Sequence, residues 1–520
     1  MRVLGLNPGH DGAATYIADG RLVISVEAEK DSFPRFSELG PHALLAALEA
    51  APSAPDVIAV GGWHNWEPGL YWQFRAGYDG LEKGTVRRSK FLGKTVELFT
   101  SSHERSHLFM TAGMHPSAPI EECAILVWEG GIGAFYRWRE FGEHIERFNV
   151  MSDPGSKYAA LFAIADPAFP TGQPYPRLED AGKMMALAAY GRELDVLPED
   201  RAVVDQLVGL AHLYPFSKGQ YAGSPLFDCG LDNPRFCAAA HYASQSIFGV
   251  FHRAAERIFR GDRPSLLIAG GCGLNCDWNE AWRRSTVFSD VFVPPCTNDS
   301  GSALGTAIDA MVHAGEPCRV DWSVFSGPDF SRDEAPDPNE WVTLGLDYDA
   351  VAARLAQGKV VAWVQGRSEI GPRALGHRSL LASPLQGSMR HRLNEIKGRE
   401  HYRPIAPCCR GEDLHRWFTT VEPDSYMLYF AHVDSTDLPA VTHVDGTARV
   451  QAVWPHDNPR LHKLLGTFGQ ATRHAVLCNT SLNFQGLGFI NRTSDLMRYC
   501  ADRRIGTIVV DDQMYLRRER

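Results

Sequence analysis

The 520-residue chain lacks any apolar run near the roughly 18 residues that a membrane-spanning helix needs. It also lacks the pattern of a secretory signal, because Asn7, His10 and Asp11 interrupt a short N-terminal apolar run. Its 11 cysteines show no paired CxxC spacing, so the sequence indicates neither a disulfide framework nor a structural zinc knuckle. We therefore expect a cytoplasmic protein with free thiols that does not enter a membrane.

An excess of positive charge is missing as well. The net charge is -10 at pH 7, whereas a dedicated nucleic-acid binder is usually basic. With 44% hydrophobic and 22% charged residues, the composition is that of a globular protein, and the length suffices for roughly two to four domains. We expect small-molecule partners, with no nucleic acid and no membrane among them.

The most informative short motif is His103-Glu104-Arg105-Ser106-His107, which we expect to lie on a helix together with the flanking VELFT and LFMTAGM. Positions i and i+4 of a helix share one face, so the two histidines can bind one metal ion with a third ligand from elsewhere. The same letters spell the HExxH motif of zinc metalloproteases, whose glutamate is a general base. With 20 histidines in the chain, such a pair also arises by chance, so both alternatives stay open.

A pattern of strand, glycine-containing turn and strand occurs twice, within residues 2–27 and 122–138. The repetition predicts a duplicated fold, and the first hairpin is typical of actin-like and sugar-kinase-like ATPases, whose turn amides face an anion. A plain surface hairpin is the alternative. A strand, glycine-rich turn and helix at 264–282 place Gly270 and Gly271 where backbone amides can hold phosphate or adenosine.

A polar stretch with three prolines at 327–340 predicts a linker. Before it, residues 1–326 are expected to form a first α/β domain, to which the family resemblance described below assigns ATP and metal binding. After it the helix and strand patterns restart, so 341–520 predicts a second α/β domain.

The second domain contains basic residues set among glycine, proline and apolar residues. Arginine forks and a lysine charge suit a small substrate that bears phosphate, and hydroxyl and amide groups that follow a buried strand suit the same anion. A solvated basic face is the alternative. The candidates are Arg367, Arg373, Arg378, Lys397, Arg399, Arg403, Asn479 and Ser481.

Asp299 lies in a loop that leads into a helix. A helix cap is one interpretation. As the third ligand beside His103 and His107, Asp299 completes a set of two histidines and one carboxylate, which suits Fe(II) or another labile divalent ion.

Several motifs coincide with those of one family. The chain resembles the O-carbamoyltransferases of the nodulation and tobramycin type over essentially its whole length. The segments VWEGGIG and EAEKDSFPRFSELG are similar to those of enzymes that carbamoylate cephems and macrolide-type metabolites. The family motifs are NPGHDGAA, HERSH, EDAGKMMALAAYG, AGGCGLNC, PPCTNDSGSALGTA, GPRALGHRSLLASP, KGREHYRPIAP and CNTSLN.

The resemblance implies an N-terminal actin- and sugar-kinase-like (Kae1-like) domain and a C-terminal YrdC-like domain. It implies that carbamoyl phosphate and ATP, which Mg²⁺ accompanies, give carbamoyl adenylate. The carbamoyl group then passes to a hydroxyl of a natural product, as in antibiotic tailoring. An Fe(II)-type metal belongs to the first domain, and a homodimer is compatible with the resemblance. A non-catalytic actin-like ATP-binding protein is a further alternative, beside the zinc metalloprotease.

The resemblance also implies roles for individual residues. The catalytic residues are His10 and Asp11, and the metal ligands are His103, His107 and Asp299. The ATP and adenylate contacts are Gly182, Lys183, Gly270, Gly271 and Asn275. The carbamoyl-phosphate contacts are Arg373, Lys397, Arg403 and Ser481, with Arg378, Arg399 and Asn479 as additional candidates.

The chain departs from the family pattern at three points, one of which is Asn298 in place of the usual glycine before Asp299. Glu129 stands where many members have aspartate, and the long helix shows CAAAHYASQ, with His241, where an aspartate is usual. The resemblance therefore names no carboxylate general base. The sequence does not name the acceptor either, although the aromatic-rich stretch 61–80 predicts an acceptor pocket, with core packing as the alternative. Its candidates are Trp63, Trp66, Tyr71 and Trp72.

Overall fold

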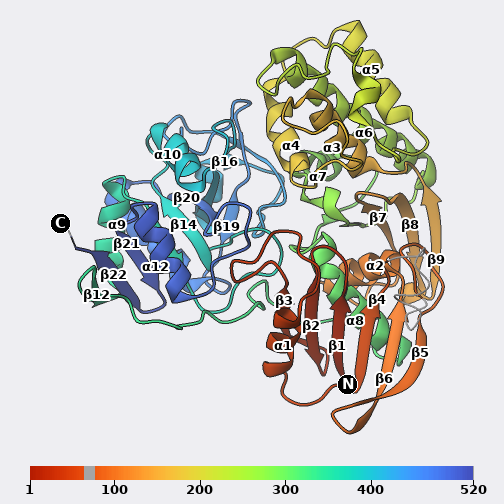
Figure 1. The fold of residues 1–520 in the computed structure, drawn as a ribbon, viewed down its shortest axis with the longest axis horizontal. Coiled ribbons are helices and arrows are strands. Elements are labelled where there is room, and N and C mark those ends of the chain that lie inside the picture. The colour runs from red at the N-terminus through yellow and green to blue at the C-terminus, as the bar shows by residue number, and fades with distance from the viewer. Residues whose placement is uncertain (64–75, 519–520) are drawn as a thin grey trace. The chain divides into compact units, whose positions relative to one another are not determined.

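The computed structural model describes residues 1–63 and 76–518 and contains two compact units, whose elements are labelled in Figure 1. The first unit comprises Met1–Pro119, Pro294–Thr442 and Ala448–Arg520, and the second comprises Ile120–Val293 with His443–Thr447. The sequence-based division into 1–326, a linker 327–340 and 341–520 stays a prediction.

A six-stranded sheet opens the first unit, in the order β3-β2-β1-β4-β6-β5 (Figure 1). Leu4 packs toward α1, whereas its neighbour Gly5 faces α8, where a Cβ atom would lie 2.2 Å from the carbonyl oxygen of Ala303. Glycine at this position therefore allows α8 to lie directly on β1. The elements are β1 (Arg2–Asn7), β2 (Ala13–Ala18), β3 (Arg21–Glu27), α1 (Pro41–Glu49), β4 (Val57–Gly61), β5 (Thr85–Phe91), β6 (Lys94–Ser101), α2 (His103–Met114) and α8 (Ser302–His313).

The sheet of the second unit has the order β11-β10-β7-β8-β9. In both sheets three consecutive strands form an antiparallel meander, and one later strand pairs in parallel with the first of them. The predicted repetition of strand, turn and strand is thus confirmed. The strands are β7 (Cys123–Trp128), β8 (Gly133–Arg139), β9 (His144–Asn149), β10 (Leu266–Ala269) and β11 (Val291–Phe292), and the helices are α3 (Pro154–Ala165), α4 (Asp180–Tyr190), α5 (Pro198–Gly209), α6 (Pro234–Ile258) and α7 (Cys276–Arg284).

An eight-stranded sheet occupies the C-terminal part of the first unit, in the order β12-β22-β21-β13-β14-β20-β15-β19. Val361 and Trp363 of β13 pack with α9 and α11, whereas Ala362 and Val364 pack with α10 and α12. Both faces are covered, which explains the continuous apolar run in β13. The strands are β12 (Trp341–Gly345), β13 (Val361–Val364), β14 (Arg378–Ala382), β15 (Ala406–Arg410), β19 (Gln451–Val453), β20 (Val476–Ser481), β21 (Thr507–Val510) and β22 (Gln513–Arg517), and the helices are α9 (Tyr348–Ala356), α10 (Ser388–Lys397), α11 (Pro459–Thr472) and α12 (Thr493–Asp502).

One helix prediction is wrong. VELFT, residues 96–100, lies in β6 and pairs with β4 and β5, and the helix begins only at His103. The buried side chain of Val96 lies between the exposed side chains of Thr95 and Glu97, as in a strand. The Ser102 hydroxyl oxygen accepts the N–H of Arg105 at 3.0 Å, which fixes the start of the helix.

The sequence predicts neither disulfides nor membrane-spanning helices. All 11 cysteines are free thiols, as predicted. Across residues 1–63 and 76–518, no helix is both long enough and apolar enough to cross a membrane.

Candidate functional site

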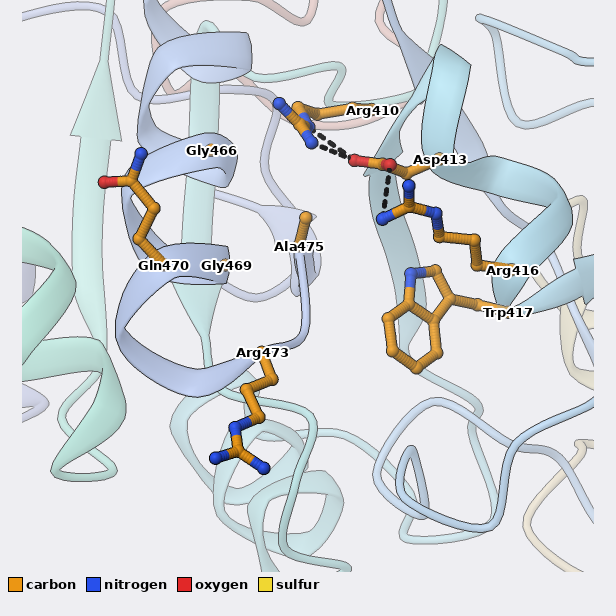
Figure 2. Close-up of a pocket in the computed structure, with 9 residues that line it drawn as sticks. All are labelled: Arg410, Asp413, Arg416, Trp417, Gly466, Gly469, Gln470, Arg473 and Ala475. Carbon is orange, nitrogen blue, oxygen red and sulfur yellow. Dashed lines mark hydrogen bonds and ion pairs between the residues drawn. The ribbon is translucent and has the colours of Figure 1, made fainter.

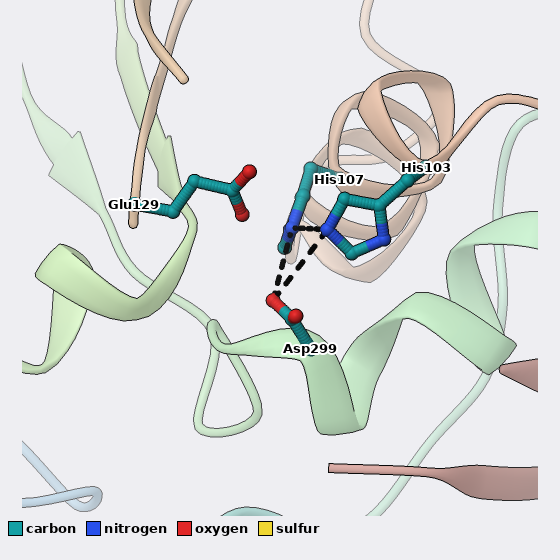
Figure 3. A group of neighbouring side chains, drawn as sticks. All are labelled: His103, His107, Glu129 and Asp299. Carbon is teal, nitrogen blue, oxygen red and sulfur yellow. Dashed lines mark hydrogen bonds and ion pairs between the residues drawn. The ribbon is translucent and has the colours of Figure 1, made fainter. Parts of the chain in front are cut away.

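The three predicted metal ligands come together in the first unit (Figure 3). His103 and His107 lie one turn apart on α2, and their Nε2 atoms are 3.1 Å from each other. Asp299, in the short turn before α8, places Oδ1 3.6 Å from Nε2 of His103 and 3.4 Å from Nε2 of His107. Two segments almost 200 residues apart in the sequence therefore contribute to one cluster.

The donor set fits a divalent metal ion. The three ligand atoms lie within 4.8 Å of one another, and all three side chains are buried. Buried imidazole nitrogens and a carboxylate that converge in this way form the set that suits Fe(II) and similar labile ions. His103, His107 and Asp299 are thus the residues that would hold such an ion.

Two contacts between α2 and α8 fix the distance between these ligands. The guanidinium of Arg105 donates to both carboxylate oxygens of Asp309, at 2.8 and 2.6 Å, and both side chains are buried. A Cβ atom at Gly305 would lie 1.8 Å from the carbonyl oxygen of Ser106, so the close approach of the helices requires glycine there. The ligand cluster therefore rests on a rigid pair of helices.

His10 and Asp11 lie beside the cluster, in the turn after β1. Nδ1 of His10 is 3.0 Å from Oδ2 of Asp11 and 3.5 Å from Oδ2 of Asp299. The side chain of His10 is 36% exposed, whereas Asp11 is buried. Burial raises the pKa of Asp11, and the hydrogen bond with His10 opposes this shift. The arrangement places a partly exposed imidazole against a buried carboxylate at the edge of the ligand set.

Glu104 does not occupy the position that a metalloprotease requires. Its side chain is buried, and its Oε2 accepts the N–H of Gly80 at 2.7 Å. In a zinc protease the glutamate must face a water molecule bound to the metal. Glu104 instead binds the main chain at Gly80, so the geometry does not support the protease alternative.

The glycine-rich turn of the nucleotide prediction lies in the second unit, between β10 and α7. Gly270 has a φ of +94°, and a Cβ atom there would lie 2.4 Å from the carbonyl oxygen of Trp128, so this position requires glycine. A Cβ atom at Gly271 would meet no atom within 4 Å. Asn275 caps α7 by accepting the N–H groups of Asp277 and Trp278 at 3.1 and 3.3 Å. The turn has the predicted form, and its role in nucleotide binding stays a prediction.

The other two nucleotide candidates lie on α4. A Cβ atom at Gly182 would meet no atom within 4 Å, and Nζ of Lys183 donates to Oδ1 of Asp180 at 2.9 Å. Two of the departures from the family pattern, at Glu129 and near His241, also lie in the second unit. Glu129 follows β7, and its carbonyl oxygen accepts the N–H of Gly155 at 2.9 Å. His241 is half-buried on α6, and burial lowers its pKa.

Lys397 and Ser481 meet in the first unit, as members of the predicted carbamoyl-phosphate set. Nζ of Lys397 donates to the carbonyl oxygen and hydroxyl of Ser481, at 2.6 and 3.2 Å. It also donates to the carbonyl oxygen of Asn483 at 3.2 Å and to the side-chain oxygen of Asn483. Burial, followed by the nearby guanidiniums of Arg399, Arg35 and Arg403, lowers the pKa of Lys397 well below its usual value. The ammonium group is thus oriented by oxygens inside a positively charged cluster.

Asn394 holds together the turn that carries Arg399 and Arg403. Its Oδ1 accepts Nε–H of Arg399 at 2.6 Å, and its Nδ2 donates to the carbonyl oxygen of Arg403 at 3.0 Å. Burial, together with Arg403 and Arg449, lowers the pKa of Arg399 to about 9. Several cations close enough to perturb one another favour an anionic ligand among them.

Arg378 and Asn479 direct their donors to protein oxygens. Arg378 is fully buried and donates to Oδ1 of Asn491 and to the carbonyl oxygens of Gln365 and Gly366, all within 2.7 to 2.9 Å. Nδ2 of Asn479 donates to the carbonyl oxygen of Ala374 at 3.2 Å and so holds the loop that contains Arg373. The geometry therefore favours a positioning role for Arg378 and Asn479, whose hydrogen bonds hold the loops around them. Arg373, which is half-buried, lies in the loop that Asn479 holds.

Sequence reasoning missed Asn483, Arg35 and Arg449 as members of this cluster. The main-chain N–H of Arg35 donates to the carbonyl oxygen of Gly486 at 3.0 Å, which joins the segment after β3 to the loop that follows Ser481. The segment EAEKDSFPRFSELG was informative only as a resemblance, and nothing local in it indicates a contact with residues more than 400 positions later. Asn483 had a signal, since positions i and i+2 of an extended chain share one face.

A surface hollow of about 210 Å³ lies elsewhere in the first unit (Figure 2). Asp413 accepts hydrogen bonds from Nε of Arg410 at 2.6 Å and makes an ion pair with Nη1 of Arg416 at 3.1 Å. The carboxylate offsets much of the positive charge of the two guanidiniums. None of the predicted site residues lines this hollow, which is therefore separate from the candidate site.

Part of the predicted aromatic acceptor pocket can be located. Trp63 is described and lies against the ring of His10, with centroids 4.9 Å apart. Trp66, Tyr71 and Trp72 lie outside the described residues.

Two family models and several known proteins match this chain. The model described as carbamoyltransferase C-terminus matches residues 352–517, and that described as carbamoyltransferase N-terminus matches residues 237–308. A 3'-hydroxymethylcephem-O-carbamoyltransferase from Amycolatopsis lactamdurans is 50% identical over 100% of both chains, and an enzyme of the same name from Streptomyces clavuligerus is 50% identical over 99% of each. Nodulation protein U from Sinorhizobium fredii is 32% identical over 94% of this chain and 95% of its own length.

Proposed function

This chain belongs to the carbamoyltransferase family and is a carbamoyltransferase, and we propose that it forms carbamoyl adenylate from carbamoyl phosphate and ATP and transfers the carbamoyl group to a hydroxyl group. The convergence of His103, His107 and Asp299 beside His10 is the observation that supports the proposal, because it provides a ligand set suited to a divalent ion next to a candidate base. The proposed acceptor is a 3'-hydroxymethylcephem, as the names of two relatives at 50% identity indicate.

The activation step is proposed for the C-terminal, YrdC-like part of the chain. Water cleaves the bond between the carbamoyl oxygen and the phosphorus of carbamoyl phosphate, which releases phosphate and leaves carbamate. A carbamate oxygen then attacks the α-phosphorus of ATP, and pyrophosphate leaves. Lys397, Arg399 and Arg403 neutralise the phosphate groups, and Ser481 and Asn483 orient the lysine ammonium. Mg²⁺ is proposed to accompany ATP.

The transfer step is proposed for the actin- and sugar-kinase-like part. The acceptor oxygen attacks the carbamoyl carbon, the bond to the adenylate oxygen breaks, and AMP leaves. His10 takes the hydroxyl proton, because its imidazole is partly exposed and oriented by Asp11. His103, His107 and Asp299 would hold a divalent ion, proposed to be Fe(II), which would supply positive charge for the adenylate phosphate.

The nucleotide is proposed to bind in the second unit. The amides of Gly270 and Gly271 and the N-terminus of α7, capped by Asn275, are suited to phosphate and adenosine. Gly182 and Lys183 of α4 are proposed as further contacts. Open space above Gly182 and Gly271 supports this proposal, because it leaves backbone accessible to a ligand.

The decisive experiment is incubation of the protein with carbamoyl phosphate, ATP, Mg²⁺ and a 3'-hydroxymethylcephem, followed by mass spectrometry. We expect a product heavier by one carbamoyl group, with release of AMP, pyrophosphate and phosphate. A panel of other hydroxylated natural products tests the acceptor class separately. No carbamoylated product across the panel, together with no pyrophosphate release, would contradict the proposal.

His10→Ala is expected to separate the two steps. Pyrophosphate release from carbamoyl phosphate and ATP should continue, whereas transfer to the acceptor should fall roughly 10²–10⁴-fold, as when a general base is removed. Pyrophosphate and carbamoylated product are measured in parallel. Equal loss of both would show that His10 is not specific to transfer.

Glu104→Gln is expected to leave transfer within about threefold of the wild-type rate, because the amide oxygen of glutamine can still accept the N–H of Gly80. A metalloprotease would lose its general base through the same change. The measurement is the initial rate of product formation, with proteolysis of casein as a parallel assay. Loss of transfer in Glu104→Gln, with a normal melting temperature, would show that the carboxylate charge itself is needed.

A further inference from the structure

We propose that Trp63 and Tyr78 form an aromatic wall of the acceptor site and that Glu104 is a positioning residue for this wall. The inference rests on the proposed function and specifies where the ring system of the acceptor binds. Both aromatic side chains are partly exposed, and both contact the ring of His103. They therefore border the ligand cluster.

The ring of Trp63 contacts both His10 and His103. Its ring centroid is 4.9 Å from that of His10 and 5.1 Å from that of His103, with interplanar angles of 85° and 87°. A Cβ atom at Gly9 would lie 2.2 Å from Cδ2 of Trp63, so the indole packs directly on the turn that contains His10. The position of the indole is thus tied to that of the candidate base.

Tyr78 extends the same surface. Its ring stacks on His103, with centroids 4.6 Å apart and an interplanar angle of 20°, and it lies 5.7 Å from the ring of Trp63. Aromatic faces beside a few fixed polar groups are typical of sites for small organic ligands. Because Trp63 also contacts His10, an acceptor ring bound against this wall would lie beside the candidate base.

Hydrogen bonds from the start of α2 hold the loop that contains Tyr78. Glu104 accepts the N–H of Gly80 at 2.7 Å, and its own main-chain N–H donates to the carbonyl oxygen of Tyr78 at 3.0 Å. The Ser102 hydroxyl donates to the carbonyl oxygen of Gly80 at 2.5 Å, and Nη1 of Arg105 donates to that of Leu81 at 3.0 Å. The wall is therefore preorganised by the same helix that bears the metal ligands.

The test is the affinity of the intact protein for a 3'-hydroxymethylcephem, measured by isothermal titration without carbamoyl phosphate, and the acceptor KM and kcat in the complete reaction. Tyr78→Ala and Trp63→Ala are expected to raise the dissociation constant and KM roughly 10- to 100-fold, the loss expected when an aromatic contact surface is removed. Tyr78→Phe keeps the ring and should bind within about twofold of wild type. Glu104→Ala should raise KM roughly tenfold, and Glu104→Gln should restore it.

Tyr175→Ala, which removes a tyrosine that is 62% exposed in the other unit, is the matched control and should bind normally. Unchanged affinity in both Tyr78→Ala and Trp63→Ala would overturn the inference, and so would a wild-type protein that does not bind the cephem. Failure of the proposed function has a different signature, namely no pyrophosphate release from carbamoyl phosphate and ATP in the wild type without acceptor. A normal melting temperature, checked for each variant, separates these outcomes from misfolding.

Discussion

Lys397→Met is expected to lower the rate of pyrophosphate release from carbamoyl phosphate and ATP by roughly 10²–10³-fold or more, the scale for removing one oriented donor from an active site. Methionine retains an unbranched stem, so the packing of α10 changes little. The variant loses the ammonium that donates to Ser481 and Asn483, and with it a positive charge inside the phosphate cluster. The measurement is a coupled pyrophosphate assay without acceptor.

Lys359→Met, which changes an exposed lysine just before β13 of the eight-stranded sheet, is the matched control. It should retain the wild-type rate. Near-normal pyrophosphate release in Lys397→Met would remove this lysine from the activation site and would leave the arginines as the phosphate ligands.

The pH dependence of carbamoyl-phosphate affinity belongs to the same prediction. Burial first, and then neighbouring guanidiniums, lowers the pKa of Lys397 well below its ordinary value in the unliganded protein. Only the protonated amine attracts the phosphate, so affinity is highest below this lowered pKa and declines as the pH rises through it. A KM profile against pH checks this, and Lys397→Met should lack that part of the decline.

Asp299→Asn is expected to lower the bound divalent metal and to slow carbamoyl transfer by roughly 10³-fold, which corresponds to several kcal/mol of lost charge stabilisation. The carboxylate Oδ1 lies within 3.6 Å of both imidazoles, so its charge is central to the donor set. An amide oxygen is a poorer ligand and carries no charge. The measurements are metal content by mass spectrometry, Co²⁺ titration followed by absorption, and product formation.

Asp19→Asn, at an aspartate whose side chain is 85% exposed, controls for the loss of one carboxylate in the same unit. A chelator applied to the wild-type protein should reproduce the transfer defect of Asp299→Asn, and added divalent metal should reverse it. Unchanged metal affinity in Asp299→Asn would show that His103 and His107 recruit another ligand, and full transfer activity without metal would contradict the assignment.

Much of the fold could be predicted because periodicity and turn chemistry are local. The alternation of apolar residues, the Asp-Gly turn at Asp19 and the glycine-rich turn at Gly270 each specify an element within a few residues of sequence. VELFT was predicted incorrectly because five apolar and polar residues fit a helix and a strand equally well. Pairing with β4 and β5 stabilises this segment as a strand, and the Ser102 cap fixes where the helix begins.

The candidate site was less predictable, since several residues have roles that depend on distant partners. An arginine such as Arg378 is a typical phosphate ligand, yet in the structure its N–H groups donate to oxygens of Gln365, Gly366 and Asn491. Arg35 belongs to a segment far from Lys397 in sequence, and tertiary contacts such as its hydrogen bond to Gly486 bring the two segments together. Side-chain donors are assigned by what they meet in space, and sequence spacing does not encode that.

The sequence by itself determined the α/β class, the repeated hairpins, the free thiols and the family resemblance, together with the spacing that puts His103 and His107 on one helix face. Each of these depends on short-range periodicity or on motif identity. Only the tertiary structure decided that Asp299 faces both imidazoles and that Glu104 binds the loop of Gly80 instead of facing a metal-bound water. The reason is physical: i,i+4 geometry fixes neighbours on a helix, whereas the packing of α8 on α2, with glycine at position 305, fixes which distant carboxylate reaches them.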